Sequence, residues 1–162
     1  MIVVVMGVSG AGKTTIGEAL AHRLGWPFID ADDHHPPENV AKMAAGTPLE
    51  DEDRWPWLDR INQELLKAQK QSRSAVIGCS ALKQAYRERL ARGLQACEIV
   101  YLRGDFKLIH SRLAARKHRF MPATLLQSQF DALEPPARAI EVDVAAPMQD
   151  SVSRIRKQLR PA

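Results

Sequence analysis

The segment 2–15, IVVVMGVSGAGKTT, constrains the fold of this chain more than any other. An apolar run ends at Gly7, and Gly12, Lys13 and Thr14 follow at the spacing G-x-x-x-x-G-K-[ST] of a phosphate-binding loop. Apolar residues at helical spacing continue after the loop, so the motif stands between a buried strand and a helix. A chance match in a glycine-rich turn is the alternative, but such a turn does not require these flanks. The segment therefore predicts an anion-binding loop that joins a strand to a helix.

The residue types of this loop fit a nucleoside triphosphate and its metal ion. Glycines at 7, 10 and 12 allow consecutive backbone N–H groups to turn toward an anion. Lys13 adds a positive charge, and Thr14 lies at a helix start that favours phosphate, with a hydroxyl that can hold Mg²⁺. We therefore expect Thr14 to be a metal ligand. The nucleotide is expected to contact Gly7, Val8, Ser9, Gly10, Ala11, Gly12, Lys13, Thr14 and Thr15.

Composition indicates one globular domain, residues 1–162. The chain has 162 residues, 45% of them hydrophobic and 26% charged, which suits a single core. No apolar run approaches the roughly 18 residues of a membrane span, and residues 2–6 are too short for a signal-peptide core. Cys79 and Cys97 lack metal-site or C-x-x-C spacing, so we interpret them as core thiols. These features predict a cytoplasmic protein with no membrane partner.

Polar side chains crowd together after the second expected strand. Residues 26–29 are predicted to form that strand, and DADDHH follows at 30–35. In an open parallel sheet this turn and the phosphate loop share one edge. Phosphoryl transfer needs one carboxylate near Mg²⁺ and one for the proton of the attacking hydroxyl. The usual Walker-B aspartate would end the strand expected at 75–79, and no aspartate is found there. Asp30 is therefore the better metal candidate. A solvated acidic loop is the alternative interpretation.

The remaining apolar segments complete an α/β pattern. Ser80 is expected to cap a helix at 81–90, and Asp105 another. Residues 30–58 and 116–123 are interpreted as a substrate-binding excursion and a small lid on one core. Five short apolar strands separated by helices predict a doubly wound parallel sheet, with strands at 2–6, 26–29, 75–79, 99–102 and 140–144.

Basic residues gather where the lid is expected, from Arg112 to Arg119. A helix surface with solvated arginines is the plain interpretation. Clustered cations can also neutralise the charge on a transferring phosphoryl group and help to exclude water. We therefore expect a basic lid that closes over the nucleotide.

Five stretches, in order along nearly the whole chain, resemble the gluconate kinase family: GVSGAGKTT, DADDHHPPENVAKMAAGTPLEDEDRWPWL, CSALKQAYRERL, YLRGDF and FMPATLLQSQFDALE. The loop is shared by many nucleotide-binding proteins, whereas HHPPENVAKMAAGTPL and DRWPWL are specific to this family. The resemblance implies ATP-dependent phosphorylation of D-gluconate to 6-phosphogluconate. It also implies a P-loop kinase fold like that of shikimate and nucleoside monophosphate kinases, and a homodimer.

The resemblance also assigns roles by position. The first carboxylate after the second strand, Asp30, would serve Mg²⁺, and Asp32 would accept or orient the substrate hydroxyl. The family usually has Gly-His before the lid phenylalanine, where this chain has His118-Arg119, which leaves Arg116 and Lys117 as the lid candidates. The implied catalytic residues are Lys13, Asp32 and Arg116, with Lys117 at the nucleotide. The implied substrate-binding residues are Asp32, Asp33, His34, His35, Lys83 and Arg87.

Two rival functions share some of these features. A kinase for another polyol acid, such as shikimate, would have the same loop and the same Asp-x-Asp pattern. A nucleotide-dependent switch or nucleic-acid-binding ATPase is compatible with a net charge of +4 and a pI near 9.3. The lysines and arginines are not gathered in one tract, however, and no aromatic-basic stacking platform is visible. We therefore expect no nucleic acid partner.

Overall fold

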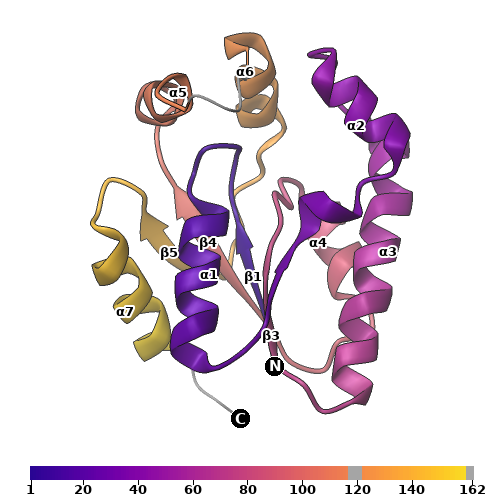
Figure 1. The fold of residues 1–162 in the computed structure, drawn as a ribbon, viewed down its shortest axis with the longest axis vertical. Coiled ribbons are helices and arrows are strands. Elements are labelled where there is room, and N and C mark those ends of the chain that lie inside the picture. Colours follow the sequence, from indigo (N-terminus) through magenta and orange to yellow (C-terminus); the bar gives the residue numbers. More distant parts are fainter. Residues whose placement is uncertain (117–121, 160–162) are drawn as a thin grey trace.

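The computed structural model describes residues 1–116 and 122–159. All strand pairs in its single sheet are parallel, and the strand order is β2-β3-β1-β4-β5 (Figure 1). This confirms the doubly wound five-stranded sheet expected from the sequence. The strands are β1 (Ile2–Met6), β2 (Phe28–Asp30), β3 (Ala75–Gly78), β4 (Cys97–Arg103) and β5 (Ile140–Asp143).

Helices cover both faces of the sheet. Helix α1 packs against α7, and α3 packs against α4 on the opposite face, as right-handed crossovers require (Figure 1). Helices α2, α5 and α6 lie beyond the carboxyl ends of the strands, at the top of Figure 1. The helices are α1 (Lys13–Leu24), α2 (Pro37–Ala44), α3 (Asp51–Lys70), α4 (Gln84–Ala91), α5 (Phe106–Ala114), α6 (Ala123–Ala132) and α7 (Met148–Gln158), with a short 3₁₀ helix at Ala31–His34.

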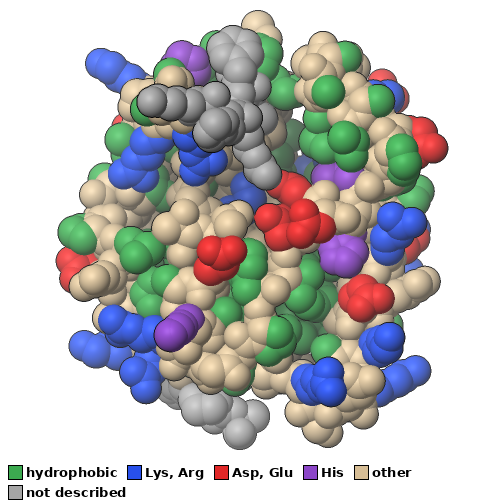
Figure 2. Space-filling model, in the orientation of Figure 1, with side chains coloured by type: hydrophobic (Ala, Val, Ile, Leu, Met, Phe, Trp, Pro, Cys, Tyr) green, Lys and Arg blue, Asp and Glu red, His purple; other side chains and the backbone are tan. Residues whose placement is uncertain are grey.

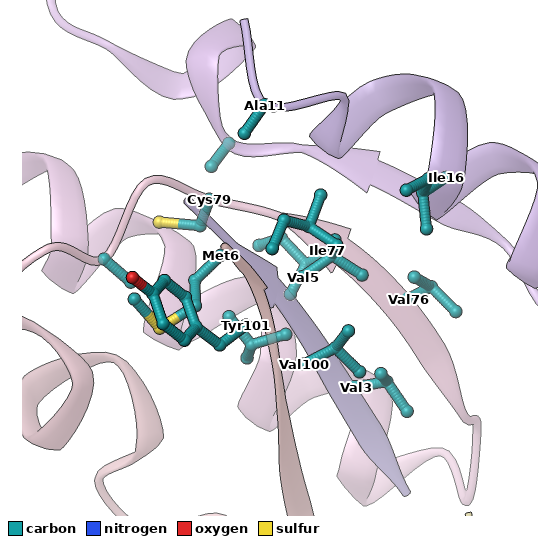
Figure 3. Packing of buried hydrophobic residues seen from close by; sticks show 14 of the residues in the cluster. Val3, Val5, Met6, Ala11, Ile16, Val76, Ile77, Cys79, Val100 and Tyr101 are labelled. Carbon is teal, nitrogen blue, oxygen red and sulfur yellow. The ribbon is translucent and has the colours of Figure 1, made fainter. Parts of the chain in front are cut away.

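Strand β1 forms the centre of the core. All five of its residues are buried, and Ile2 pairs with both Ala75 of β3 and Cys97 of β4. Val3 and Val5 lie among aliphatic side chains of the neighbouring strands, and α1 packs over the sheet (Figure 3). Side chains buried on both faces are typical of a central parallel strand. The phosphate loop therefore follows a strand that is fully buried and paired on both sides.

One helix start differs from its prediction. Helix α4 begins at Gln84, not at Ala81, and its N-cap is Lys83, not Ser80. Ala81 has a positive φ of 45°, which a helix cannot accommodate. The guanidinium of Arg87 binds the carbonyls of this segment, so a tertiary contact replaces the expected cap.

Other local predictions are confirmed or shifted slightly. The Asp105 carboxylate accepts a hydrogen bond of 2.8 Å from the Leu108 N–H, as expected of an N-cap. Glu50 and Asp53 form a capping box at the start of α3. Strand β2 begins two residues later than expected, at Phe28. In the ranges 1–116 and 122–159, no helix has both the length and the apolar character needed to cross a membrane.

Candidate active site

A large cavity of about 1070 Å³ opens at the carboxyl ends of the strands. The phosphate loop and the turn after β2 line it, together with α2, the start of α3, the segment after β3, and α6. In the side view of Figure 2, acidic side chains lie near the middle of the molecule, below its upper end. Of the residues expected at the site, the cavity is lined by Ser9, Gly10, Gly12, Lys13, Thr14, Thr15, Asp32, His35, Lys83 and Arg116.

The phosphate loop has a conformation that only glycine adopts easily. Gly10 has φ of 83° and Gly12 has φ of 96°, both in the left-handed region. A Cβ on Gly10 would lie 2.6 Å from Cγ of Leu113 in α5, so the loop also packs too tightly there for a side chain. Gly12 is the N-cap of α1, which points its unpaired N–H groups toward the cavity. The buried Val8 and Ala11 form the base of the loop.

The amino group of Lys13 is held at the loop. Its Nζ donates to the carbonyls of Gly7 and Val8, each at 3.0 Å. Burial lowers the pKa of Lys13, and the nearby charge of Asp32 opposes that shift. A partly desolvated cation beside an anion-binding loop can neutralise phosphate charge strongly, because little water screens it.

The turn after β2 is fixed by hydrogen bonds from two directions. The Asp30 carboxylate accepts from the Asp32 N–H at 2.9 Å, and the Trp57 indole donates to the Ala31 carbonyl at 2.7 Å. These contacts aim Asp32 into the cavity, where its side chain is 51% exposed. The turn thus presents the Asp32 carboxylate to the cavity, whereas the Asp30 carboxylate binds the turn and does not line the cavity.

In the turn after β2, two of the residues predicted to bind the substrate do not line the cavity. Asp33 is exposed outside it, and His34 contributes a backbone carbonyl that accepts from Arg60 at 3.2 Å. His35 does line the cavity, and its Nε2 lies 3.8 Å from Oδ1 of Asp32. Burial lowers the pKa of His35, which favours the neutral form of its ring.

A charged cluster on the α3 and α4 side of the cavity was only partly expected. Lys83 was predicted, and its Nζ donates to Asp51 Oδ1 at 3.3 Å. The Tyr86 hydroxyl donates to the same oxygen, and Arg54 donates to the Tyr86 hydroxyl at 3.3 Å. Burial, followed by the bond to Asp51, raises the pKa of Tyr86. Tyr86 follows Lys83 by three residues, about one helical turn, and that spacing was the signal by which it could have been found.

Arg87 lies away from the cavity, which does not agree with its expected contact to a substrate carboxylate. Its guanidinium donates to the carbonyls of Ala81 at 2.7 Å, Leu82 at 3.1 Å and Glu134 at 2.8 Å. The residue is only 5% exposed, and burial lowers its pKa. These bonds connect the segment before α4 to the chain that follows α6, which is a structural role.

Helix α6 contacts the phosphate loop through a residue that was not predicted. The Ser9 N–H donates to Oε1 of Gln129 at 2.8 Å, and Nε2 of Gln129 donates to the Ser9 hydroxyl at 3.1 Å. The two residues are 120 positions apart, and no local pattern in the sequence marks their pairing. Arg116 lines the same cavity and is exposed. Lys117, the other lid candidate, lies outside the described residues.

The residues expected to hold a metal ion are too few for an all-protein metal site, but they suit Mg²⁺. Among the residues that the structure describes, no group of three or more His, Cys, Asp or Glu side chains could hold a metal. Mg²⁺ is usually held by one or two carboxylates with substrate phosphates and water. Thr14 lines the cavity, whereas Asp30 does not line it and accepts from the backbone N–H of Asp32, which does. One hydroxyl and one carboxylate next to the cavity are compatible with that arrangement.

Comparison with known proteins gives the family. The profile of a family described as Shikimate kinase matches residues 9–135. A probable gluconokinase of Xenopus tropicalis is 44% identical over 98% of this chain and 93% of that protein. The chain belongs to the gluconokinase family. The thermosensitive gluconokinase of Escherichia coli (strain K12) is 42% identical, over 98% of this chain and 85% of that protein.

A solved gluconokinase structure agrees with this assignment. The crystal structure of a gluconokinase from Sinorhizobium meliloti 1021 is 44% identical, with a TM-score of 0.85 over 94% of this chain and 87% of that chain. Membership of the gluconokinase family confirms the resemblance read from the sequence, and with it the P-loop kinase fold. The roles of individual side chains remain predictions.

Proposed function

We propose that this protein transfers the γ-phosphoryl group of ATP to the 6-hydroxyl of D-gluconate. One observation carries the proposal: a single cavity joins the phosphate loop and Lys13 to the Asp32 carboxylate and to the cluster around Lys83. A donor site and an acceptor site in one cavity are what direct transfer between two bound substrates requires. The family relationship supports ATP and gluconate as the two substrates.

The acceptor side of the cavity suits a sugar acid. Gluconate carries one carboxylate and a chain of hydroxyl groups. Arg54 and Lys83 supply positive charge for the carboxylate, whereas Asp51 can accept hydrogen bonds from hydroxyls. Since Asp32 lies on the phosphate-loop side, a substrate with its carboxylate at Lys83 would extend its far hydroxyl toward Asp32.

The proposed reaction is an in-line displacement. The 6-hydroxyl oxygen forms a bond to the γ-phosphorus as the bond to the β-phosphate oxygen breaks, and Asp32 accepts the hydroxyl proton. Lys13 and Arg116 neutralise charge on the transferring group. Bound Mg²⁺, held by Thr14 and Asp30, would offset charge on the phosphate oxygens. Lys117 is proposed as a further nucleotide contact.

Formation of ADP by the purified protein tests this function. We expect ADP release with D-gluconate and ATP, and 6-phosphogluconate as the product by NMR. Asp32→Asn should lower kcat by orders of magnitude and leave ATP binding unchanged, because the amide cannot accept the proton. A preference for shikimate, or stimulation by DNA or RNA without gluconate, would contradict the proposal.

A homodimer and a cytoplasmic location are part of the same proposal. The family resemblance supports the homodimer, and light scattering on the purified protein measures it directly. Both cysteines, Cys79 and Cys97, are free thiols, which suits a reducing compartment. Fractionation of cells that express the protein tests the location.

A further inference from the structure

The His35 ring is held in one orientation by the aromatic residue beneath it. The imidazole stacks on the indole of Trp57, with ring centroids 4.1 Å apart and an interplanar angle of 15°. Trp57 is itself fixed by its bond to the Ala31 carbonyl. The His35 side chain is only 3% exposed, yet it lines the cavity. The ring therefore presents one edge to the site and has little freedom to turn.

Asn39 determines which nitrogen of this ring carries the proton. Its Nδ2 donates to the Asp53 carbonyl at 2.9 Å and lies 3.1 Å from Nδ1 of His35. A carbonyl can only accept, so the NH₂ group of the amide must face Asp53, and its second hydrogen points to Nδ1. Nδ1 is therefore an acceptor, and the proton of the neutral ring lies on Nε2. Asn39 is buried, with 2% of its surface exposed, which keeps this arrangement in place.

The Nε2–H group lacks a direct hydrogen bond to the carboxylate that it faces. Its distance of 3.8 Å from Asp32 Oδ1 exceeds hydrogen-bond range. A hydroxyl oxygen to one side of the line that joins these two atoms can accept from Nε2–H and donate its proton to the carboxylate, at ordinary bond lengths for both. One lone pair of that oxygen then remains free to attack phosphorus.

We propose that His35 Nε2–H and Asp32 together hold the acceptor hydroxyl, and that Asn39 is the positioning residue that fixes the His35 tautomer. This inference rests on the proposed gluconate phosphorylation. The donor and acceptor pair orients the hydroxyl for attack, beyond the proton transfer assigned to Asp32. A ligand without that hydroxyl leaves the cavity-facing Nε2–H without a partner in the complex, so it should bind less tightly.

A comparison of D-gluconate with 6-deoxy-D-gluconate tests the His35 contact. Calorimetry on the full-length wild-type protein should show tighter binding of gluconate by about tenfold, the size expected for one or two hydrogen bonds. In His35→Phe, which keeps the stacking on Trp57, this preference should fall several-fold, and kcat should fall as well. His35→Gln, with an amide N–H, should recover part of the preference. His22→Phe, an exposed control on α1, should behave as wild type.

The tautomer can be measured without turnover. Two-dimensional ¹⁵N–¹H spectra of the ring should show Nε2–H in the wild type and a larger Nδ1–H population in Asn39→Ser. Wild-type discrimination in a folded His35→Phe, or an Nδ1–H tautomer in the wild type, would overturn the inference. Absence of gluconate-dependent ADP formation in the wild type would instead refute the proposed function, with the tautomer result still valid.

Discussion

Replacement of Arg87 by methionine distinguishes a structural role from a substrate-binding role. Methionine keeps the aliphatic stem of the side chain but removes donors to three backbone carbonyls, those of Ala81, Leu82 and Glu134. A hydrogen bond from a charged donor contributes about 1.5–3 kcal/mol. Part of this is retained, because the Leu82 carbonyl also accepts from the Glu134 N–H and water can reach the partly exposed Glu134 carbonyl. We therefore expect Arg87→Met to lower the free energy of unfolding by about 3 kcal/mol.

This loss is large enough to measure by two methods. For a chain of this size, 1 kcal/mol corresponds to roughly 2–4 °C, so the Tm should fall by about 6–12 °C. Urea unfolding should show a lower midpoint with an unchanged slope. The Tm of Arg87→Lys should lie between those of the wild type and Arg87→Met, because one ammonium group cannot reach all three carbonyls. Arg92→Met, at an exposed position beyond the end of α4, should change stability by less than about 0.5 kcal/mol.

Kinetics at a temperature where the variants are folded complete the test. Because Arg87 does not line the cavity, the KM for gluconate should remain within about twofold of wild type. An unchanged Tm together with a KM raised tenfold or more would refute the structural role. It would show that Arg87 contacts the substrate, as the family resemblance had implied.

Three further substitutions or treatments have defined outcomes. Gly17→Ala would place a Cβ 2.4 Å from the Phe28 ring. The overpacking should cost about 1–3 kcal/mol, which exceeds the gain of about 1 kcal/mol in helix propensity. Thermal unfolding measures the net loss of stability, and a stabilised variant would contradict this prediction. Gln129→Leu removes both bonds to Ser9, so the KM for ATP should rise by about fivefold, whereas an equal KM would show that the pair has no role in loop geometry. Burial raises the pKa of Cys79 to about 12, so the folded protein should resist alkylation there at pH 8, as followed by peptide mass spectrometry. Since the folded-state pKa is the higher one, stability from this thiol is complete below about pH 9 and should decline as pH rises above it.

Local patterns were sufficient to predict the sheet and the strand, loop and helix geometry of residues 2–15. The apolar run at 2–6 and the loop that follows are contiguous, so their geometry is set by residues near one another in sequence. The start of α4 was predicted wrongly because Arg87 binds the carbonyls of Ala81 and Leu82, and this contact overrides the capping tendency of Ser80.

The acceptor half was harder to predict because it joins distant residues. Asp51 and Tyr86 are 35 positions apart, and Arg54 and Tyr86 are 32 apart, so no spacing rule connects them. The helix expected at 81–90 included both Lys83 and Arg87, and the family resemblance implied that both bind the substrate. In the structure Lys83 precedes the helix and faces the cavity, whereas Arg87 turns back into the protein.

The central place of β1 has a consequence for the order in which the protein can fold during synthesis. Its two hydrogen-bonded neighbours are β3 at 75–78 and β4 at 97–103, so the first strand to leave the ribosome is among the last to be enclosed. A nascent chain that stops before residue 97 lacks β4, one of the two strands that pair with β1 next to the phosphate loop. Pairing between such distant segments is slow compared with local helix formation. Nucleotide binding should therefore begin only when about two-thirds of the chain has been synthesised and released from the exit tunnel.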